Sequence, residues 1–466
     1  MSASPIRAEG SAFAAQARDR SGLDPDSRSG AQRLVSLTEE LLSRPGKASS
    51  VAGARAILEQ FEESDEGSKV TYFEALVDRF GADHKRLTEA AHQYLDDPSN
   101  AHAVALHDAA EPRRQELIRR LNRAPGGTAA LVDMRRQLIE QLENCPDLVD
   151  ADHDFYHLLS SWFDLGFLAL ERIHWSTPGT ILEKIIQYEA VHEILTWDDL
   201  RRRIEPSDRR CYGFFHPNLA DEPLIFVSVA LTQGIPTAIH PLLSEEHSPI
   251  SSAAADTAVF YSISNCQQGL LGVSFGDFLI KQVVEELALD LPGLRTFVTL
   301  SPVPGFKRWL STVIAEDSNS LIRAEHRETL KLLDKSDWHS TPETAAALEE
   351  LIVPLAAFYF LRARREDNTP VDAVARFHLA NGARLERINW LGDVSAASLS
   401  NAAGLMVNYL YDLRYIERNH AAFVGRGEVV ASTAIRERLG ELSKNCRPRN
   451  VCNPDAGDSL SVPGKE

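Results

Sequence analysis

The sequence predicts a mixed fold, α+β or α/β, in which a helical N-terminal domain precedes a domain of alternating strands and helices. Two patterns predict it. Apolar residues recur at helical spacing through most of residues 36–172. After Trp175 the Ser-Thr-Pro-Gly sequence at Ser176–Gly179 interrupts this pattern, and β-rich apolar runs follow. A domain boundary is therefore expected between Arg172 and Trp175.

The helical elements of the first part are recognised by their apolar spacing. Leu131, Met134, Leu138 and Leu142 fall on one face of the predicted helix TAALVDMRRQLIEQLEN. The segment DFYHLLSSWFDLGFLALERI is apolar on nearly all sides, which predicts a helix buried in its own bundle or against another subunit.

Two buried strands are predicted in the second part, LIFVSVAL at 224–231 and AVFYSIS at 258–264. The second strand leads through a glycine-rich loop into a helix at 277–289, and RTFVTL follows as the next strand. This order predicts a unit of strand, glycine loop, helix and strand.

The remaining sequence also alternates. KRWLSTVIAE, RETLKLLDK and TPETAAALEELIVPLAAFYFLRARR are typical of helices, and LERINW of a short strand. We expect SAASLSNAAGLMVNYLYDL to form one helix with a face of small residues.

Composition excludes several classes of protein. Of 466 residues, 44% are hydrophobic and 25% charged, as in folded globular chains. The net charge of −18 disfavours nucleic acid as a partner. The longest apolar run, 351–361, is too short to span a membrane, so no membrane association is expected. The terminal segments 1–30 and 449–466 are predicted to be disordered tails.

The cysteines indicate a reducing compartment. None of the five lies in a CxxC pair, so neither a zinc cluster nor a disulfide framework is predicted, and we expect no bound metal. No targeting signal is evident, and a cytoplasmic location is the expectation. The five are Cys145, Cys211, Cys266, Cys446 and Cys452.

The glycine loop 267–276 is the first candidate site. Gly269, Gly272 and Gly276 let the backbone approach a ligand closely, and the start of the following helix favours an anion such as a phosphate. The same glycines also suit an ordinary tight connection. The loop is neither GxGxxG nor a P-loop.

Ser301 and His378 are candidates of a different kind. Ser301 ends a predicted strand in TLSPVPGF, where ligands often bind, but a simple Ser-Pro turn explains it equally and no GxSxG motif surrounds it. His378, beside an Asn-Gly turn, could supply a proton near neutral pH, although a lone histidine is usually structural.

Three long segments in register resemble the malonyl-CoA decarboxylase family. They are FYSISNCQQGLLGVSFGDFLIKQVVEEL, TLSPVPGFKRWL and ARFHLANGARLERINWLGDVS. The resemblance covers most of 172–423. It implies an α+β chain of two domains: an N-terminal all-α bundle at 31–172 used for oligomerisation, as a homodimer or homotetramer, and a GNAT-like acyltransferase-fold catalytic domain at 173–448.

The resemblance also implies the activity and its residues. The family converts malonyl-CoA to acetyl-CoA and CO₂ without a cofactor. By motif, Ser301 and His378 are the catalytic serine and histidine, and Lys184 in TILEKI is associated with activity. Some members have Glu at the position of Ser274, so no carboxylate role is carried over there. The expected substrate-binding residues are Gln268, Gly269, Leu271, Gly272, Val273, Ser274, Phe275, Gly276 and Asp277.

These residue types fit the chemistry. Loss of CO₂ leaves a thioester enolate, so the site needs donors for the oxygen and an acid for the α-carbon. We expect His378 to be that acid and Ser301 to hold the malonyl carboxylate or the thioester oxygen. An acyl-CoA-dependent N-acyltransferase on the same fold is the alternative. A scaffold that only binds coenzyme A is a third reading, which the joint presence of both motifs disfavours.

Overall fold

The chain forms two compact units. The first holds the described residues up to Ser161 together with the short segment Gly269–Val273, and the second holds Trp162–Gln268 and the described residues after Val273. The computed structural model describes residues 25–43, 47–219, 221–273, 279–315, 321–335 and 337–440.

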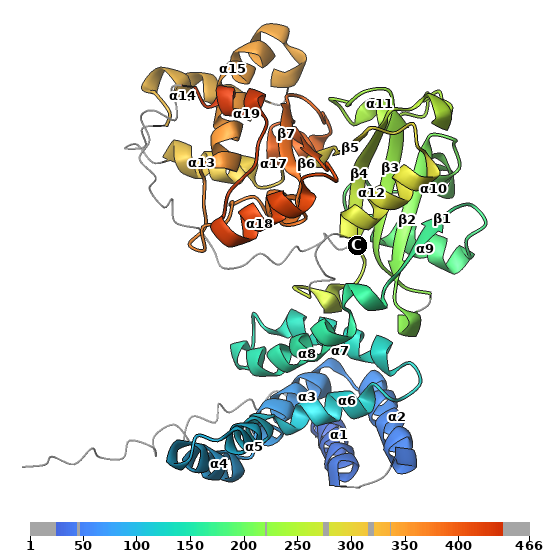
Figure 1. Ribbon diagram of the computed structural model, residues 1–466, viewed down its shortest axis with the longest axis vertical. Coiled ribbons are helices and arrows are strands. Elements are labelled where there is room, and N and C mark those ends of the chain that lie inside the picture. Colours follow the sequence, from blue (N-terminus) through green and yellow to red (C-terminus); the bar gives the residue numbers. More distant parts are fainter. Residues whose placement is uncertain are drawn as a thin grey trace, which may run out of the picture. The chain divides into compact units, whose positions relative to one another are not determined.

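The first unit is helical (Figure 1). Leu131, Met134 and Leu138 are buried on α7 as their spacing predicts, whereas Leu142 is only partly covered. The helices are α1 (Pro25–Ser43), α2 (Lys47–Glu63), α3 (Glu66–Arg79), α4 (His84–Asp96), α5 (Asn100–Ala110), α6 (Arg113–Leu121), α7 (Gly127–Gln141) and α8 (Val149–Trp162).

A buried ion pair crosses the core of this unit. Arg114 on α6 donates through Nε to the carboxylate of Asp154 on α8, and both side chains are almost fully buried. Its other nitrogens donate to the carbonyls of Leu76 and Asp150. The charges of Arg114 and Asp154 can be buried because they pair with each other, and because the other nitrogens of Arg114 also have hydrogen-bond acceptors.

The second unit is built on one mixed sheet (Figure 1). Among the described residues it has eight strands in the order β1-β2-β3-β4-β5-β8-β6, with β7 pairing β8. Of the strands that the structure describes, β4 and β5 are the one parallel pair, and the crossover helix α12 (Leu279–Asp290) lies between them in sequence. The strands are β1 (Ala169–Ile173), β2 (Arg209–Phe215), β3 (Pro223–Thr232), β4 (Thr257–Asn265), β5 (Thr296–Thr299), β6 (Ser301–Pro302), β7 (Arg384–Asn389) and β8 (Met406–Leu410).

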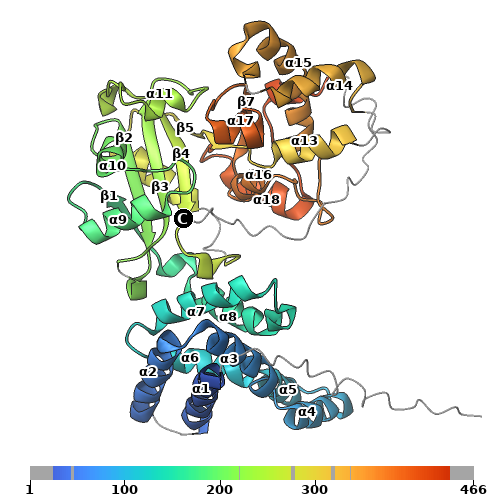
Figure 2. The same ribbon diagram turned by 180° about the vertical axis from the view of Figure 1, so that it is seen from behind.

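Helices cover both faces of this sheet. Helix α12 lies in front of the strands in Figure 1, and α9 lies in front of them in the reverse view of Figure 2. Successive residues of β2 serve the two faces: Cys211 belongs to the cluster beneath α9, whereas Tyr212 interacts with Glu286 and Asp290 of α12. The helices of this unit are α9 (Gly179–Tyr188), α10 (Trp197–Ile204), α11 (His240–Leu243), α12, α13 (Phe306–Ala315), α14 (Ala324–Leu330), α15 (Pro342–Leu361), α16 (Ala373–Ala380), α17 (Ala396–Ala402), α18 (Ile416–Arg426) and α19 (Thr433–Arg438).

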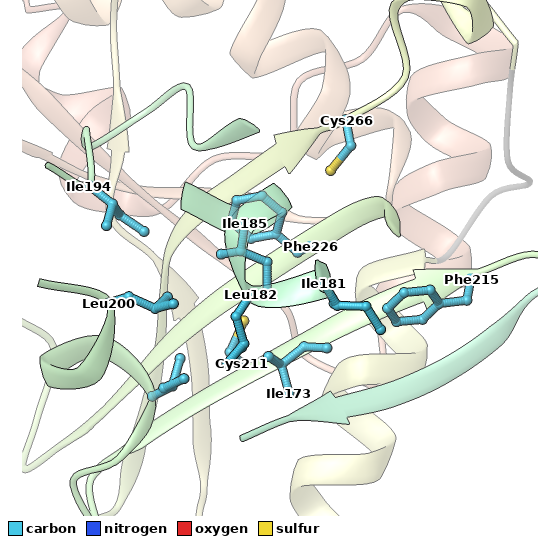
Figure 3. Close-up of a cluster of buried hydrophobic side chains, with 11 residues drawn as sticks. Ile173, Ile181, Leu182, Ile185, Ile194, Leu200, Cys211, Phe215, Phe226 and Cys266 are labelled. Carbon is cyan, nitrogen blue, oxygen red and sulfur yellow. The ribbon is translucent and has the colours of Figure 1, made fainter. Parts of the chain in front are cut away.

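The face beneath α9 is closed by an apolar cluster. Figure 3 shows Ile181, Leu182 and Ile185 of α9 grouped with Cys211 and Phe226 of the sheet. Ile185 is 1% exposed. This packing fixes α9 on the strands that precede the glycine loop.

Helix α15 is 20 residues long and, by length and composition alone, could cross a membrane. More than half of its apolar window is buried inside the protein, at 56%. Such burial is typical of a core helix. The helix continues through Pro354, as its sequence pattern predicts.

Two predicted helices are wrong. In DFYHLLSSWFDLGFLALERI the helix ends at Trp162, and Ala169–Ile173 forms the edge strand β1 paired with β2. The second error is SAASLSNAAGLMVNYLYDL, where helix α17 ends at Ala402 and MVNYL forms β8. Ala403 and Gly404 both have positive φ, which terminates a helix, and the alternating apolar run that follows suits a strand.

The described structure otherwise agrees with the predicted class. A helical N-terminal region precedes a mixed sheet flanked by helices, so the fold is α+β, with the parallel β4–β5 pair and its crossover helix where the glycine-loop unit was predicted.

We predict that Ile185→Ala lowers the free energy of unfolding by about 2–5 kcal/mol, because it removes buried methyl groups and leaves a cavity beneath α9. Leu195→Ala is the matched control, since Leu195 is 70% exposed, and should change stability by less than about 0.5 kcal/mol. Urea unfolding of the two variants measures the difference. Equal effects would show that α9 is not part of the core.

Candidate active site

Ser301 is placed by an exchange of strand partners. β8 pairs with β5 at Val298↔Leu410 and then with β6 at Ser301↔Val407. Thr299 lies between these two pairings, and the backbone N–H of Tyr409 donates to its Oγ1 at 3.1 Å. The strand end therefore presents Thr299 and Ser301 toward the same neighbouring segment.

A hydrogen-bond chain runs through Ser301. Its Oγ lies 3.0 Å from Nε2 of His378 and donates to Oγ1 of Thr299 at 2.9 Å. Nδ1 of His378 lies 2.8 Å from the hydroxyl of Tyr411. All four side chains are buried, with exposed fractions of 0–6%. The chain thus links four residues from β5, β6, α16 and the residue after β8.

The ring of His378 is fixed from several sides. It stacks on the ring of Tyr409 with centroids 4.5 Å apart, and Phe377 contacts its edge. The backbone carbonyl of His378 accepts from the N–H of Ala383 at 3.0 Å, which closes the Asn-Gly turn after α16. Gly382 in that turn has φ of +79°, and a Cβ there would lie 2.3 Å from the carbonyl oxygen of Ile416.

The start of α16 is also fixed. Asp372 caps this helix by accepting from the N–H of Ala375 at 2.7 Å. The hydroxyl of Tyr359 on α15 donates to the same carboxyl at 3.2 Å. A Cβ at Gly305 would come within 2.7 Å of that hydroxyl, so the glycine of the SPVPGF motif leaves room for Tyr359.

Burial sets the protonation of this site. It lowers the pKa of His378 from 6.5 to about 3, because the imidazolium would lose its hydration. Burial likewise raises the pKa of Tyr411 well above its usual value, and it raises the pKa of Asp372 to about 6. At neutral pH His378 and Tyr411 are therefore both uncharged.

The directions of the bonds follow from these charges. Because the hydroxyl of Ser301 donates to Thr299, its oxygen is free to accept the Nε2 proton of His378, and the hydroxyl of Tyr411 then donates to Nδ1. This places the imidazole proton on the side of Ser301. Such an arrangement can donate a hydrogen bond, or a proton, to a group that becomes strongly basic.

The glycine loop is described only in part. Gln268 is exposed and starts the 3₁₀ turn η6 (Gln268–Leu270), Gly269 and Val273 are buried, and Leu271 is 45% exposed. Gly272 has φ of +79°, and the N–H of Val273 donates to the carbonyl of Leu270 at 3.0 Å, which is a turn that needs a glycine. The predicted binding residues Ser274, Phe275, Gly276 and Asp277 lie outside the described residues.

Lys184 lies in another part of the second unit. Its Nζ pairs with the carboxylate of Glu222, 2.5 Å away, and donates to the carbonyl of Asp221 at 2.9 Å. These partners immediately precede β3, and β4 separates β3 from the strand that leads to Ser301. The structure thus brings Ser301 and His378 together and pairs Lys184 elsewhere, so its catalytic assignment stays a prediction.

No group of three or more His, Cys, Asp or Glu side chains within the described residues could hold a metal ion. Cys211 and Cys266 are buried, and burial raises the pKa of both thiols, Cys211 to about 12. These two sulfurs therefore behave as apolar core groups.

Comparison with known families covers both parts of the chain. Residues 166–449 match the malonyl-CoA decarboxylase C-terminal domain, and residues 80–163 match the malonyl-CoA decarboxylase N-terminal domain. The chain belongs to the malonyl-CoA decarboxylase family. The resemblance seen in the three sequence segments is thereby confirmed.

Known relatives match this chain over most of their own length. The chain is 37% identical to the mitochondrial malonyl-CoA decarboxylase of Anser anser anser over 400 residues, which is 79% of each protein. A crystal structure of the malonyl-CoA decarboxylase from Rhodopseudomonas palustris is 54% identical, with a TM-score of 0.85 over 87% of this chain and 99% of that one. The Agrobacterium vitis protein is 55% identical, with a TM-score of 0.85 over 88% and 100%.

Family membership makes this chain a carboxy-lyase, as predicted. The alternative, an N-acyltransferase, is not favoured, because these relatives are all malonyl-CoA decarboxylases.

Sequence reasoning missed Thr299 and Tyr411 as partners of the site. The signal for Tyr411 was the alternation of Tyr409 and Tyr411, which in a strand share one side. The helix predicted over SAASLSNAAGLMVNYLYDL conceals this alternation. Thr299 stands two residues before Ser301, again at strand spacing.

We predict an acid-dependent loss of stability that depends on His378. Its pKa is about 3 in the folded chain and about 6.5 when unfolded, so the unfolded chain binds more protons between these values. The stability from neutral His378 is therefore complete above pH 6.5 and is lost as pH falls toward 3. Relative to His378→Asn, the wild type should lose about 2 kcal/mol between pH 6.5 and pH 5, at up to about 1.4 kcal/mol per unit.

Urea unfolding at pH 7, 6 and 5 measures this difference, and Asp372 is common to both proteins and cancels. Replacement of the exposed His153 by Asn is the control and should follow the wild type. A constant difference between wild type and His378→Asn at all three pH values would contradict the buried, neutral histidine.

Proposed function

We propose that this chain decarboxylates malonyl-CoA to acetyl-CoA and CO₂, with His378 as the proton donor to carbon and Ser301 as the group that orients the malonyl thioester. The observation that carries the proposal is the buried contact of 3.0 Å between Ser301 Oγ and His378 Nε2 in a chain of this family. The two segments that hold these residues are 77 positions apart in sequence.

The step balances with the groups present. The bond between the α-carbon and the carboxylate breaks, its electron pair forms the thioester enolate, and CO₂ leaves. The Nε2 proton of neutral His378 then passes to the α-carbon of the enolate, which is a stronger base than the imidazolate that this transfer leaves. Tyr411 donates to Nδ1 and stabilises the electron-rich ring, which regains its proton from solvent. The overall reaction consumes one proton for each CO₂ released.

Ser301 suits an orienting role more than a nucleophilic one. A nucleophilic serine must give its proton to a base, whereas here its hydroxyl donates to Thr299 and its oxygen faces the Nε2 proton. When the thioester binds, the same hydroxyl can turn to donate to a substrate oxygen. The carboxylate or the developing enolate would accept that bond.

We also propose that the glycine loop recognises the pyrophosphate of coenzyme A. Supporting this are its position before a 12-residue helix, α12, and the backbone turn at Gly272. No cofactor or metal is proposed, because the thioester carbonyl itself accepts the electron pair.

We further propose a cytoplasmic enzyme that forms a homodimer or homotetramer through its helical domain. On α4 and α5 of that domain Leu95 and Val104 are 78% and 60% exposed.

The direct test is release of acetyl-CoA and CO₂ from malonyl-CoA alone. We predict full activity in EDTA and in a reducing agent, because no metal or cysteine takes part in the proposed step. Chromatography of the thioesters, with and without an added amine acceptor, measures it. Acetyl-CoA formed without the acceptor supports decarboxylation, whereas turnover that requires the amine, or activity restored by zinc, contradicts it.

We predict that His378→Asn lowers kcat by roughly 10²-fold or more while the Kd for acetyl-CoA stays unchanged, since the imidazole acts in the transition state.

Ser301→Ala should lower kcat/KM for malonyl-CoA. Mass spectra of quenched wild-type reactions should show no acylated enzyme. The pH profile of wild-type kcat/KM should show no ionisation of His378 between pH 6 and 8, because the pKa of this residue is about 3.

Ser311→Ala, on an exposed position of α13, is the matched control and should match the wild type. An acetyl or malonyl mass on Ser301 would replace this mechanism with covalent catalysis. A rate change with a pKa near 6.5 that vanishes in His378→Asn would show a charged histidine instead.

A further inference from the structure

The first five residues after Gln268 belong to the helical unit. Within it, Arg135 of α7 donates through its Nη1 to the carbonyl oxygens of Gly269 and Leu271, both at 2.9 Å. Nε of the same guanidinium donates to Asp152 of α8 at 2.8 Å. The side chain of Arg135 is only 4% exposed. The buried guanidinium of Arg135 therefore links α7 and α8 to two backbone carbonyls of this segment.

The geometry of the guanidinium explains why arginine stands here. One edge of the planar group faces the carboxylate of Asp152, and the remaining nitrogen has two protons for two carbonyls. Tyr156 of α8 lies beside it, with the guanidinium carbon 5.6 Å from the ring centroid. A side chain with a single donor direction could not make all of these contacts.

The two glycines of the segment are required for different reasons. A Cβ at Gly269 would lie 1.8 Å from the carbonyl oxygen of Val132, so only glycine lets the segment rest on α7. A Cβ at Gly272 would find Tyr156 at an ordinary 3.8 Å, so this glycine is required by its φ of +79°. Gly269 therefore serves docking on the helix, and Gly272 serves the turn that follows.

We propose that Arg135 is a positioning residue for coenzyme A recognition. It holds the backbone of Gly269–Val273 in its turn conformation before the ligand arrives, so binding does not have to order this segment. The inference rests on the proposed function, because it takes Gly269–Val273, the described part of the glycine loop, as contributing to pyrophosphate recognition. It assigns the helical unit a part in substrate affinity that none of the predicted site residues supplies.

A purely structural role for Arg135 predicts an equal effect on every substrate. Comparing a substrate that contains the pyrophosphate with one that lacks it therefore separates a positioning role from a structural one. Malonyl-CoA contains the pyrophosphate, whereas malonyl-N-acetylcysteamine has the same reacting thioester without it. Arg135→Gln should lower kcat/KM for malonyl-CoA about tenfold through KM, with kcat within about twofold, and leave kcat/KM for malonyl-N-acetylcysteamine unchanged. The Kd for coenzyme A, measured by calorimetry, should rise by a similar factor.

Arg114→Gln is the matched control. Arg114 is also a buried arginine of the helical unit, paired with an aspartate of α8 and two carbonyls, but all of its partners lie in the helices. It should lower the thermal midpoint of unfolding and leave the ratio of kcat/KM between the two substrates at the wild-type value. Only the Arg135 variant should change that ratio.

Arg135→Lys is the second variant, used at any temperature where Arg135→Gln is not fully folded. Lysine keeps the positive charge but lacks the planar edge of the guanidinium. The kcat/KM for malonyl-CoA divided by that for malonyl-N-acetylcysteamine should therefore fall at least about threefold. An unchanged ratio in the folded variant overturns the assignment. So does an equal loss with both substrates, which marks a structural role. A wild type that decarboxylates neither substrate overturns the proposed function, and the assignment with it.

Discussion

The buried hydrogen-bond chain from Tyr411 through His378 and Ser301 to Thr299 is the constraint on which the candidate active site depends. Each of these polar groups is removed from water, so each needs its partner within the chain. Their mutual satisfaction is what permits a histidine at 3% exposure. The same burial keeps the imidazole neutral, so this chain of four side chains is polar without being charged.

The sheet supplies the precision that this chain requires. Strand β8 bonds to β5, β6 and β7, so the segment carrying Tyr409 and Tyr411 is held against the strand end that carries Thr299 and Ser301. The amide of Asn408, fully buried, adds a bond of 2.7 Å to the carbonyl of Thr299. His378 comes from a helix whose start is fixed by Asp372 and whose end is fixed by the Gly382 turn. Its position is therefore set at both ends.

Sequence alone singled out Ser301 and His378, which the structure brings together, but not the residues around them. Ser301 and His378 stand in long motifs, and the buried strands β3 and β4 follow from continuous apolar runs. The sequence does not reveal Tyr411 as a partner of the site. The seven residues of helix α17 precede β8, and the small residues between these two elements are compatible with a helix or a strand. The close approach of Gly269 to α7 joins positions more than a hundred residues apart, which no local pattern encodes.

In the mechanism proposed above, the absence of charge in the hydrogen-bond chain bears on the loss of CO₂. Within the described residues, the side chains bonded to Ser301 and His378 are Thr299 and Tyr411, neither of them charged, while Lys184 is paired with Glu222. A cation held against the malonyl carboxylate would stabilise the ground state and oppose loss of CO₂. Neutral donors stabilise that carboxylate less. In the proposed mechanism these donors remain available for the enolate oxygen, where the charge moves as the carbon–carbon bond breaks, and they would therefore favour the transition state over the ground state.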